Sequence, residues 1–270
     1  MEIWSIGTAL RDPRRIPSFL NILAQFNNRY WDEEAQLDYY IELIRNGLVP
    51  KATIKSHQLN IAQPAARNLM YKTYTDAPMR GRVLGSLFNK LGFININNYN
   101  LTLTNRTISL LNGNISLSEA LIAALSEWQY VHSFSQWNNV FDNIPRLEYS
   151  SFSPFVSTLY LISRVNSLSG NNEGISYQEY KLFAKTIDHY SLIEPFANMI
   201  INSRNNGQYL DNFKNFIVNN FDNLNNLEDY SDNDLKYFSE TGLILVQQRI
   251  NLNYDEIGRI ENIIRANIHI

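Results

Sequence analysis

The sequence contains no cysteine. This absence excludes disulfide bonds, thiolate nucleophiles and cysteine-ligated zinc or iron–sulfur sites, and it agrees with a reducing cytosol. Long apolar runs are also missing: no stretch approaches the ~18 consecutive apolar residues of a membrane-spanning helix. The N-terminus lacks the basic segment followed by an apolar one that marks a secretion signal. We therefore expect a cytoplasmic protein with no membrane partner.

Familiar catalytic motifs are missing as well. There is no HExxH, no GxSxG and no glycine-rich phosphate loop, and the histidines are dispersed along the chain. A metal-dependent nuclease needs an Asp, a second carboxylate and a Lys converging around a divalent cation. Only Glu179-Tyr180-Lys181 resembles part of such a set, and it lies in a predicted helix with no strand-borne Asp before it. We therefore predict no catalytic residue, no metal ligand and no cofactor in this chain.

Charge is distributed unevenly along the chain. With 270 residues, of which 44% are hydrophobic, the chain can form one large domain or two smaller ones. The net charge of -3 is the sum of -2 over residues 1–50, +7 over residues 51–110 and -8 over residues 111–270. Positive charge is therefore concentrated in one segment, as a phosphate-facing surface requires.

The segment 79–113 contains the clearest local pattern. Residues 79–91 predict a helix, which Gly92 ends, and strands are expected at 93–96 and 101–104 around a polar turn at Asn97 and Asn98. Another helix is expected after Thr104. Helical spacing places these residues on the packed face of the first helix: Val83, Leu84, Leu87, Phe88 and Leu91. The order helix, hairpin, helix is typical of the second half of a winged helix, which binds duplex DNA.

Further helices are predicted before and after this segment. Asp12 is a plausible N-cap for a helix from about Ile16 to Phe26, and a second helix runs from about Asp32 to Asn46. Ser116 or Ser118 starts an apolar helix within residues 115–134, and a junction is expected near residues 143–153. The later helices are expected at residues 155–166, 176–188, 192–203 and 210–221.

The C-terminal region repeats the helix-and-hairpin pattern. The two copies align with Phe88 on Phe238, Gly92 on Gly242, Ile94 on Ile244 and Leu103 on Leu252. We predict a mainly α fold with small β-hairpins and two winged-helix-like, or helix-turn-helix, subdomains, covering residues 1–145 and 146–270. The alternative is that the two copies are not related modules, because any helix followed by a glycine and a hairpin gives a similar sequence pattern.

The two copies differ in charge. The second helix carries acidic residues, namely Asp229, Asp232, Asp234 and Glu240. Phosphates would repel them, so we expect the first module to bind DNA and the second to pack or to link.

Candidate DNA contacts lie mostly in the basic segment. Arg80 and Arg82 suit guanine, where a bidentate contact contributes roughly 1–3 kcal/mol of discrimination. Ser86 and Asn89 share the polar face of the helix, Asn89 being suited to adenine, and Lys90 suits phosphate. We predict that four residues contact phosphates and position the protein on DNA: Lys51, Lys55, Arg67 and Lys72. Three further candidate DNA contacts lie at a predicted helix start: Arg11, Arg14 and Arg15. For each of them the alternative is a solvated surface, and Arg11 could instead pair with an acid of the second helix.

Several segments, taken in order, resemble the AlwI-like type IIS restriction and nicking endonucleases. These segments are "WSIGTALRDPRRI", "YW", "APMRGRVLGSLFNKLGFI", "LTLTNRTISLLNGNISLSEALIAALSEWQY", "SPFVSTLYLISRV" and "LKYFSETGLILV". The resemblance implies an N-terminal half that recognises a short asymmetric site in double-stranded DNA. It also implies a C-terminal PD-(D/E)xK nuclease domain that uses carboxylates and Mg2+ to cut to one side of that site.

By this resemblance the chain corresponds to the recognition half, with the nuclease domain absent. The parent protein is then a site-specific deoxyribonuclease, and the nuclease domain, to which Mg2+ belongs, is either part of a longer polypeptide or a separate subunit. By resemblance, the positions that match the family's motifs are Arg11, Pro13 and Arg15, together with the helix around Arg80 and Arg82. Two other classes stay open: a winged-helix transcription regulator that dimerises on a palindrome, and a module in which both winged domains bind protein.

Overall fold

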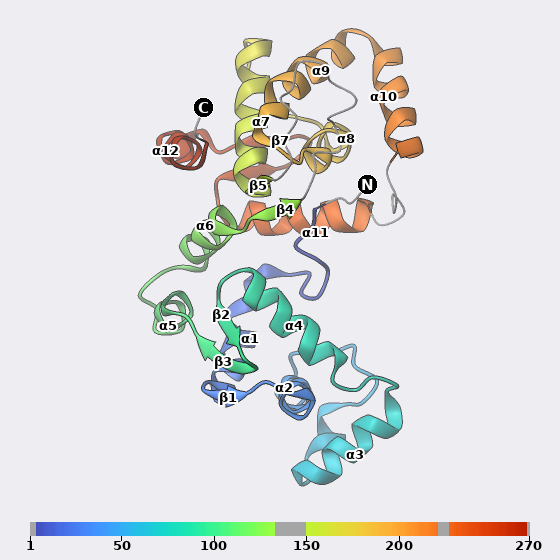
Figure 1. Ribbon diagram of the computed structural model, residues 1–270, viewed down its shortest axis with the longest axis vertical. Helices are drawn as coiled ribbons and strands as arrows, with labels where there is room; N and C mark the ends of the chain where they lie inside the picture. The colour runs from blue at the N-terminus through green and yellow to red at the C-terminus, as the bar shows by residue number, and fades with distance from the viewer. Residues whose placement is uncertain (1–3, 133–149, 221–226, 269–270) are drawn as a thin grey trace. The chain divides into compact units, whose positions relative to one another are not determined.

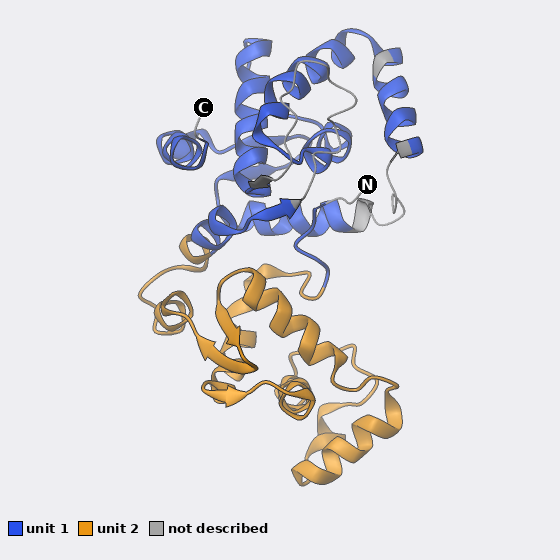
Figure 2. Ribbon diagram, viewed as in Figure 1, with its two compact units in different colours: residues 1–8, 121–270 blue, residues 9–120 orange. Residues whose placement is uncertain are grey.

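The computed structural model describes residues 4–132, 150–220 and 227–268 (Figure 1). The protein is mainly helical and has small antiparallel sheets. It divides into two compact units, coloured separately in Figure 2: an N-terminal unit, Ala9–Ala120, and a C-terminal unit that combines Met1–Thr8 with Leu121–Ile270. The boundary expected at residue 145 lies in 133–149, outside the described residues, and the predicted domain assignment stays a prediction.

The N-terminal unit combines helices with one three-stranded sheet. Its helical elements are η1 (Pro13–Arg15), α1 (Ile16–Leu23), η2 (Ala24–Phe26), α2 (Glu33–Arg45), η3 (Ser56–Leu59), α3 (Gln63–Thr73), α4 (Met79–Lys90) and α5 (Asn105–Leu111). The sheet has the strand order β1-β3-β2, formed by β1 (Arg29–Tyr30), β2 (Ile94–Asn97) and β3 (Asn100–Leu103). β3 is therefore central and pairs antiparallel with both neighbours.

Capping residues and glycines mark where these helices start and end, and the Asp12 cap and the Gly92 stop are those that the sequence predicts. Asp12 accepts a hydrogen bond from the Arg14 N–H at the start of η1, and Asp32 accepts one from the Ala35 N–H at the start of α2. Gly47 and Gly92 both adopt positive φ, 69° and 65°, just beyond the ends of α2 and α4. The predicted ends of these helices are therefore confirmed.

Aromatic side chains form the core of the N-terminal unit. Phe26, Trp31 and Tyr39 are buried, and their ring centroids lie 5.8–6.1 Å apart. Phe88 at the end of α4 contacts Phe93, which precedes β2, at 6.4 Å. The first group packs on α2, and the second joins α4 to the hairpin.

The C-terminal unit is larger and also mainly helical. Its helices are α7 (Pro154–Ser169), α8 (Tyr177–Leu182), η4 (Ala184–Thr186), η5 (Tyr190–Leu192), α9 (Ile193–Asn205), α10 (Gly207–Asn220), α11 (Leu227–Glu240), η7 (Tyr254–Glu256) and α12 (Ile257–Asn267). The chain enters this unit through α6 (Leu117–Glu127). The strands form two antiparallel pairs, β4 (Tyr130–His132) with β5 (Ser150–Phe152) and β6 (Ile244–Val246) with β7 (Ile250–Leu252).

Two predicted helices end earlier than expected. The helix expected within residues 115–134 is α6, and the chain then turns into β4, where Tyr130 pairs with Phe152 across the strands. The helix expected over residues 176–188 ends at Leu182. There the Thr186 hydroxyl donates to the Leu182 carbonyl. This side-chain hydrogen bond takes the place of the backbone hydrogen bond that a continued helix would make to the same carbonyl.

The predicted repeat of helix and hairpin is present in both units. Ile94 pairs with Leu103 in the first hairpin, and Ile244 pairs with Leu252 at the matching position of the second. Gly242 has a φ of 74°, close to that of Gly92. The sequence alignment thus marks equivalent backbone positions.

The N-terminal residues belong to the C-terminal unit through α11. The buried Asp234 carboxylate accepts a hydrogen bond from the Ile6 N–H at 2.9 Å and forms an ion pair with the buried ammonium of Lys185. Lys185 also donates to the Trp4 carbonyl and lies 3.8 Å from the centroid of the Trp4 ring. Residues 4–7 are therefore anchored to an element more than two hundred residues later in the chain.

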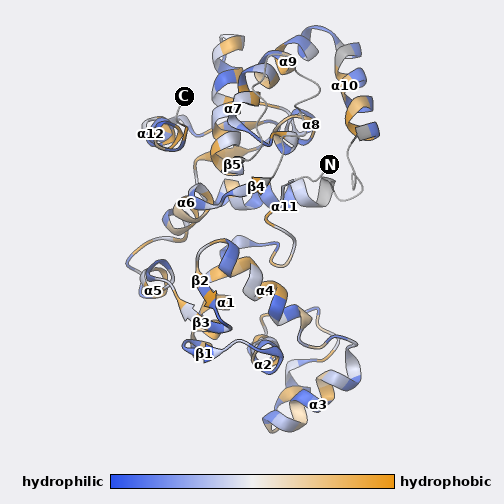
Figure 3. Ribbon diagram, viewed as in Figure 1, coloured by the Kyte–Doolittle hydropathy of each residue, from blue (hydrophilic) through white to orange (hydrophobic). Residues whose placement is uncertain are grey.

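Hydropathy along the helices agrees with one packed face and one solvated face. Figure 3 shows hydrophobic and hydrophilic segments alternating along most helices. Within the described residues, no helix combines the length and the apolar character that crossing a bilayer requires. As predicted, Trp4, Trp31 and Trp128 are buried, whereas Trp137 lies outside the described residues.

Candidate nucleic-acid interface

Helix α4 lies close against α2 because two of its buried residues are glycines. A Cβ atom at Gly81 would lie 1.9 Å from the Gln36 carbonyl oxygen of α2. A Cβ at Gly85, one turn later, would lie 2.8 Å from Cζ2 of Trp31. These glycines, with Leu84, Leu87 and Phe88, form the buried face of α4.

The opposite face of α4 is exposed and carries most of the predicted contact residues. Its exposed residues are Met79, Arg80, Arg82, Val83, Ser86, Asn89 and Lys90. At 100° per residue, Arg82, Ser86 and Lys90 lie near the centre of this face. Val83, which the apolar spacing assigned to the packed face, is 44% exposed. That assignment is wrong because Gly81 and Gly85, and not Val83, face α2 and Trp31.

Arg80 lies at the edge of the exposed face, nearer the packed side. Its positive charge acts on Tyr40 of α2, where it partly opposes the burial that raises the pKa of the Tyr40 hydroxyl. This position distinguishes Arg80 from Arg82, although the sequence grouped them together.

Arg82 makes ion pairs at the surface. Its guanidinium lies 2.6 Å from the Asp76 carboxylate and 4.0 Å from that of Glu33. All three side chains are substantially exposed, and such pairs contribute only about 0–1 kcal/mol to stability. The guanidinium can therefore exchange these partners for a phosphate or a base at little cost.

Asn89 links α4 to the hairpin. Its side-chain oxygen accepts a hydrogen bond from the Ile96 N–H at 3.1 Å, so this oxygen is engaged within the protein. The side chain still lies on the exposed surface, next to Lys90 in sequence. Asn89 therefore has a structural contact that the sequence did not indicate.

The remaining basic residues differ in how firmly they are held. Arg67 forms a two-pronged contact with the Asp38 carboxylate and also pairs with Glu34. Lys55 donates to the Ala52 carbonyl at 2.9 Å. Lys51 and Lys72 are exposed. Arg67 and Lys55 thus support the local fold, whereas Lys51 and Lys72 extend into solvent.

At the start of the N-terminal unit, the three arginines are also arranged differently. Arg14 forms a two-pronged pair with Asp12, at 2.9 and 3.0 Å, and is exposed. Arg15 donates to the Leu48 carbonyl and lies 5.0 Å from the centroid of the Phe19 ring. Arg11 is exposed.

The hairpin tip and the neighbouring strand β1 add two residues that the sequence did not indicate. Tyr30 of β1 and Tyr99 of the β2–β3 turn are 58% and 64% exposed, and their ring centroids lie 5.4 Å apart. Tyrosine flanked by asparagine in a turn is a weak signal, and Tyr30 comes close only because β1 joins the sheet beside β3. An exposed aromatic pair is a candidate contact surface.

The sequence leads us to expect that all the acidic residues of α11 would repel phosphates, but the structure gives two of them partners within the protein. Asp234 is buried with Lys185, and Asp232 accepts a hydrogen bond from the Tyr177 hydroxyl. Burial alone raises the pKa of Asp234 and lowers that of Lys185, and the opposite charge of each opposes the shift of the other. Asp234 therefore anchors the N-terminal residues and adds little negative charge to the surface.

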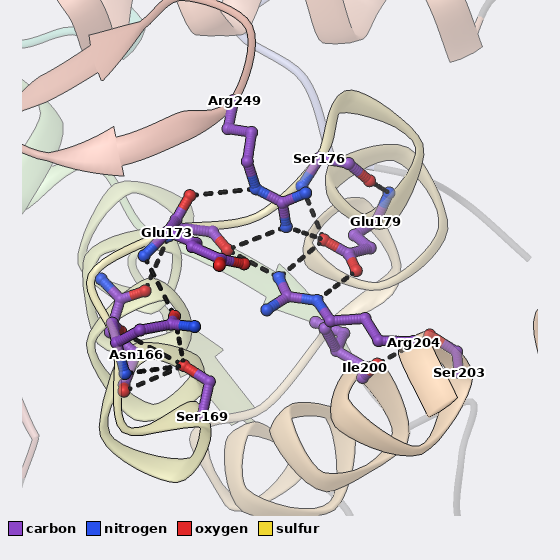
Figure 4. A network of polar contacts seen from close by, with 11 residues as sticks. Asn166, Ser169, Glu173, Ser176, Glu179, Ile200, Ser203, Arg204 and Arg249 are labelled. Atoms are coloured by element: carbon purple, nitrogen blue, oxygen red, sulfur yellow. Dashed lines mark hydrogen bonds and ion pairs between the residues drawn. The ribbon is translucent and has the colours of Figure 1, made fainter. Parts of the chain in front are cut away.

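Glu179, the only acidic residue singled out as a nuclease candidate, lies in the polar network of Figure 4. Arg204 donates to both of its carboxylate oxygens, at 2.8 and 3.0 Å, and Arg249 approaches one of them at 3.2 Å. Burial would raise the pKa of Glu179, but Arg204, the Ser176 N–H and Arg249 hold it below its ordinary value. Both carboxylate oxygens already have cationic partners, so Glu179 does not fit a Mg2+ site.

No cluster of three or more His, Asp or Glu residues suited to a metal ion occurs among the described residues.

Two-thirds of the chain, residues 89–268, match the AlwI restriction endonuclease family. No curated protein matches the chain. The match includes the end of α4, both hairpins and α12, and the family cleaves DNA at specific sites. The chain therefore belongs to the AlwI restriction endonuclease family.

Proposed function

We propose that this chain recognises the target of a type IIS restriction or nicking endonuclease by binding a short asymmetric site in duplex DNA. Helix α4 enters the major groove, with Arg82 and Ser86 toward the bases and Lys90 toward a phosphate. One observation carries this proposal: glycine contacts seat one face of α4 against α2, while its polar and basic face is exposed.

The order of elements supports a winged helix in the N-terminal unit. Along the chain come α1, β1, α2, α4 and then the β2–β3 hairpin, with β1 paired to β3. In a helix-turn-helix variant of this kind, the helix before the hairpin is the recognition helix, and the hairpin is the wing. On this interpretation α3 is an insertion between α2 and α4.

A related order in the C-terminal unit supports a second winged-helix module. There α7 is followed by Ile175, which bridges to Ile250 of β7, and then by α8, α11 and the β6–β7 hairpin, with α9 and α10 between α8 and α11. Residues 111–270 carry a net charge of -8, whereas residues 51–110 carry +7. Modules of similar order but opposite charge in one chain suit an asymmetric site, because a palindrome requires two equivalent surfaces.

Cleavage and its Mg2+ are assigned, in this proposal, to residues outside those described. The observation that supports this assignment concerns one residue: Arg204 and Arg249 both donate to the Glu179 carboxylate, so that this carboxylate is not open to a metal ion. DNA recognition then needs no divalent metal. We expect the affinity of the full chain for its site to stay the same when a chelator such as EDTA is added.

The experiment is selection of bound duplexes from a random-sequence pool by the full chain, followed by affinity measurements at several salt concentrations. We expect one asymmetric sequence to be enriched and bound by a single chain, with affinity falling as salt rises because counterions are released. No enrichment, or no salt dependence, would refute the proposal. A palindrome bound by two chains would instead identify a dimeric regulator.

A matched pair of variants tests the role of α4. Arg82→Ala should weaken binding to the enriched sequence by roughly 1–3 kcal/mol, as expected for the loss of a base-contacting arginine. The control is Arg265→Ala, because Arg265 is another exposed arginine in an ion pair, with Glu261 of α12 at 2.8 Å. Equal losses for the two variants would contradict the assignment of α4.

A further inference from the structure

Tyr99 at the tip of the β2–β3 hairpin and Tyr30 in the neighbouring strand β1 form an exposed pair of tyrosines. The rings of Tyr30 and Tyr99 contact each other at 5.4 Å, and more than half of each side chain is open to solvent. Large aromatic residues ordinarily bury their rings. Because these two rings are exposed, neither contributes to the core of the N-terminal unit. The pair is available to a partner.

The backbone at Tyr99 is strained. Asn98 and Tyr99 form the two-residue loop of the hairpin, with φ values of 49° and 60°. A loop with both residues at positive φ favours Asn-Gly, and a bulky side chain at the second position is an outlier. Strain of this kind persists where the residue has a function, because glycine would form the same turn without it.

Backbone contacts, and not the tyrosine rings, hold the tip in place. The Trp31 N–H donates to the Tyr99 carbonyl, and the Asn28 N–H donates to the Leu101 carbonyl at 2.8 Å. Tyr30 lies opposite Asn100 in the β1–β3 register. The two rings are therefore presented by a fixed backbone, and removing either ring leaves these hydrogen bonds intact.

The chemistry of the hairpin beside the rings suits a polyanion with sugar rings, and two exposed acids that follow Tyr30 in sequence, Glu33 and Glu34, face Arg82 and Arg67. The hairpin residues 94–103 include no carboxylate, and four exposed asparagines surround the tip, namely Asn95, Asn97, Asn98 and Asn100. Arg29, beside Tyr30 in β1, is exposed as well. Phenol hydroxyls donate hydrogen bonds to phosphate oxygens, aromatic faces pack on deoxyribose, and the uncharged asparagines do not repel the phosphates.

We propose that Tyr30 and Tyr99 form a clamp on the deoxyribose–phosphate backbone of duplex DNA. This inference rests on the proposed function and adds a second contact surface, separate from α4 and indifferent to base sequence. Because phenols are neutral, the clamp contributes affinity without releasing counterions. Its removal should weaken binding equally on all sequences and leave the salt dependence unchanged.

The test is Tyr99→Gly in the full chain, measured by thermal unfolding and by titration of two duplexes, the enriched sequence and a scrambled one. Glycine suits the positive φ, so the variant should unfold at the same temperature as the wild type or higher. Affinity should nevertheless fall roughly three- to tenfold on both duplexes, as the loss of one hydrogen bond and its ring contact implies. The slope of log affinity against log salt should match that of the wild type.

Two controls separate the rings from the turn. Asn98→Gly relaxes the same loop but keeps both tyrosines, and it should bind as the wild type does. Tyr71→Ala removes a tyrosine of α3 that is 53% exposed, and it should also bind as the wild type does.

Three results would overturn the clamp: unchanged affinity of Tyr99→Gly, a loss confined to the enriched sequence, or an equal loss in Asn98→Gly. If the wild type binds neither duplex, the proposed function fails and the clamp fails with it. Wild-type binding with an unaffected Tyr99→Gly refutes the clamp alone.

Discussion

At the scale of single residues, two glycines determine which face of α4 is buried. Gly81 and Gly85 lie one turn apart, against the Gln36 carbonyl and the Trp31 ring. Glycine adds nothing to an apolar stripe, so hydrophobic spacing cannot reveal this contact. The same contact leaves Val83 exposed and turns Arg82 and Ser86 outward.

Gly81→Ala should therefore destabilise the N-terminal unit strongly. Its new methyl group would lie 1.9 Å from a backbone oxygen, which cannot rotate away, and we expect a loss of about 3 kcal/mol, the upper end of overpacking effects. Gly258→Ala is the control, since nothing lies within 4 Å of this helical glycine; it should gain roughly 0.5–1 kcal/mol. Denaturant unfolding measures both, and a neutral Gly81→Ala would contradict the close packing of α4 on α2.

At the scale of elements, the network around Glu179 joins the second hairpin to its neighbours. Arg249 of the β6–β7 turn donates to the Glu173 carbonyl at 3.0 Å and to Glu179, while Arg204 of α9 reaches the same carboxylate (Figure 4). Glu179 also accepts a hydrogen bond from the Ser176 N–H, completing a capping box at the start of α8. One carboxylate thus connects α8, α9 and the hairpin.

Glu179→Gln should cost on the order of 3 kcal/mol, because it leaves two guanidinium groups without their carboxylate. The effect should depend on pH in a defined direction. The pKa of Glu179 is lowered in the folded protein, so its stabilisation is complete above the unfolded pKa of about 4.3 and is lost as pH falls through the folded pKa. Unfolding of wild type and variant between pH 7 and pH 3 should show the difference narrowing at the acidic end. A difference independent of pH would contradict the ionic role.

At the scale of the whole molecule, the C-terminal unit includes residues from both before and after the N-terminal unit in sequence. Residues 4–7 join the C-terminal unit through Asp234, Lys185 and Asn233, whose side-chain amide donates to the Gly7 carbonyl. The N-terminal unit is therefore inserted between two parts of the C-terminal unit in sequence. The contacts of residues 4–7 thus form part of the packing of the C-terminal unit.

Asp234→Asn should destabilise the C-terminal unit by about 3–5 kcal/mol, because it leaves the Lys185 ammonium buried without a counter-charge. Hydrogen exchange should show lost protection in residues 4–7 and in the C-terminal unit, with the core of residues 9–120 still protected. The double variant Asp234→Leu with Lys185→Met removes both charges and should recover much of the loss. A double variant as unstable as the single one would contradict this account.

The sequence by itself determined the features that depend on near neighbours. Helix starts at Asp12 and Asp32, helix ends at Gly47 and Gly92, and the register shared by the two hairpins follow from capping and spacing within a few residues. The family is evident from motifs in order along the chain, and the charge asymmetry needs only counting.

Only the tertiary structure decided the features that join distant residues. It placed the glycine face of α4 on α2, buried Asp234 against Lys185, and brought Tyr30 beside Tyr99. The physical reason is common to all three. A side chain's exposure and charge partners depend on which elements meet, and elements far apart in sequence meet only when the whole unit packs.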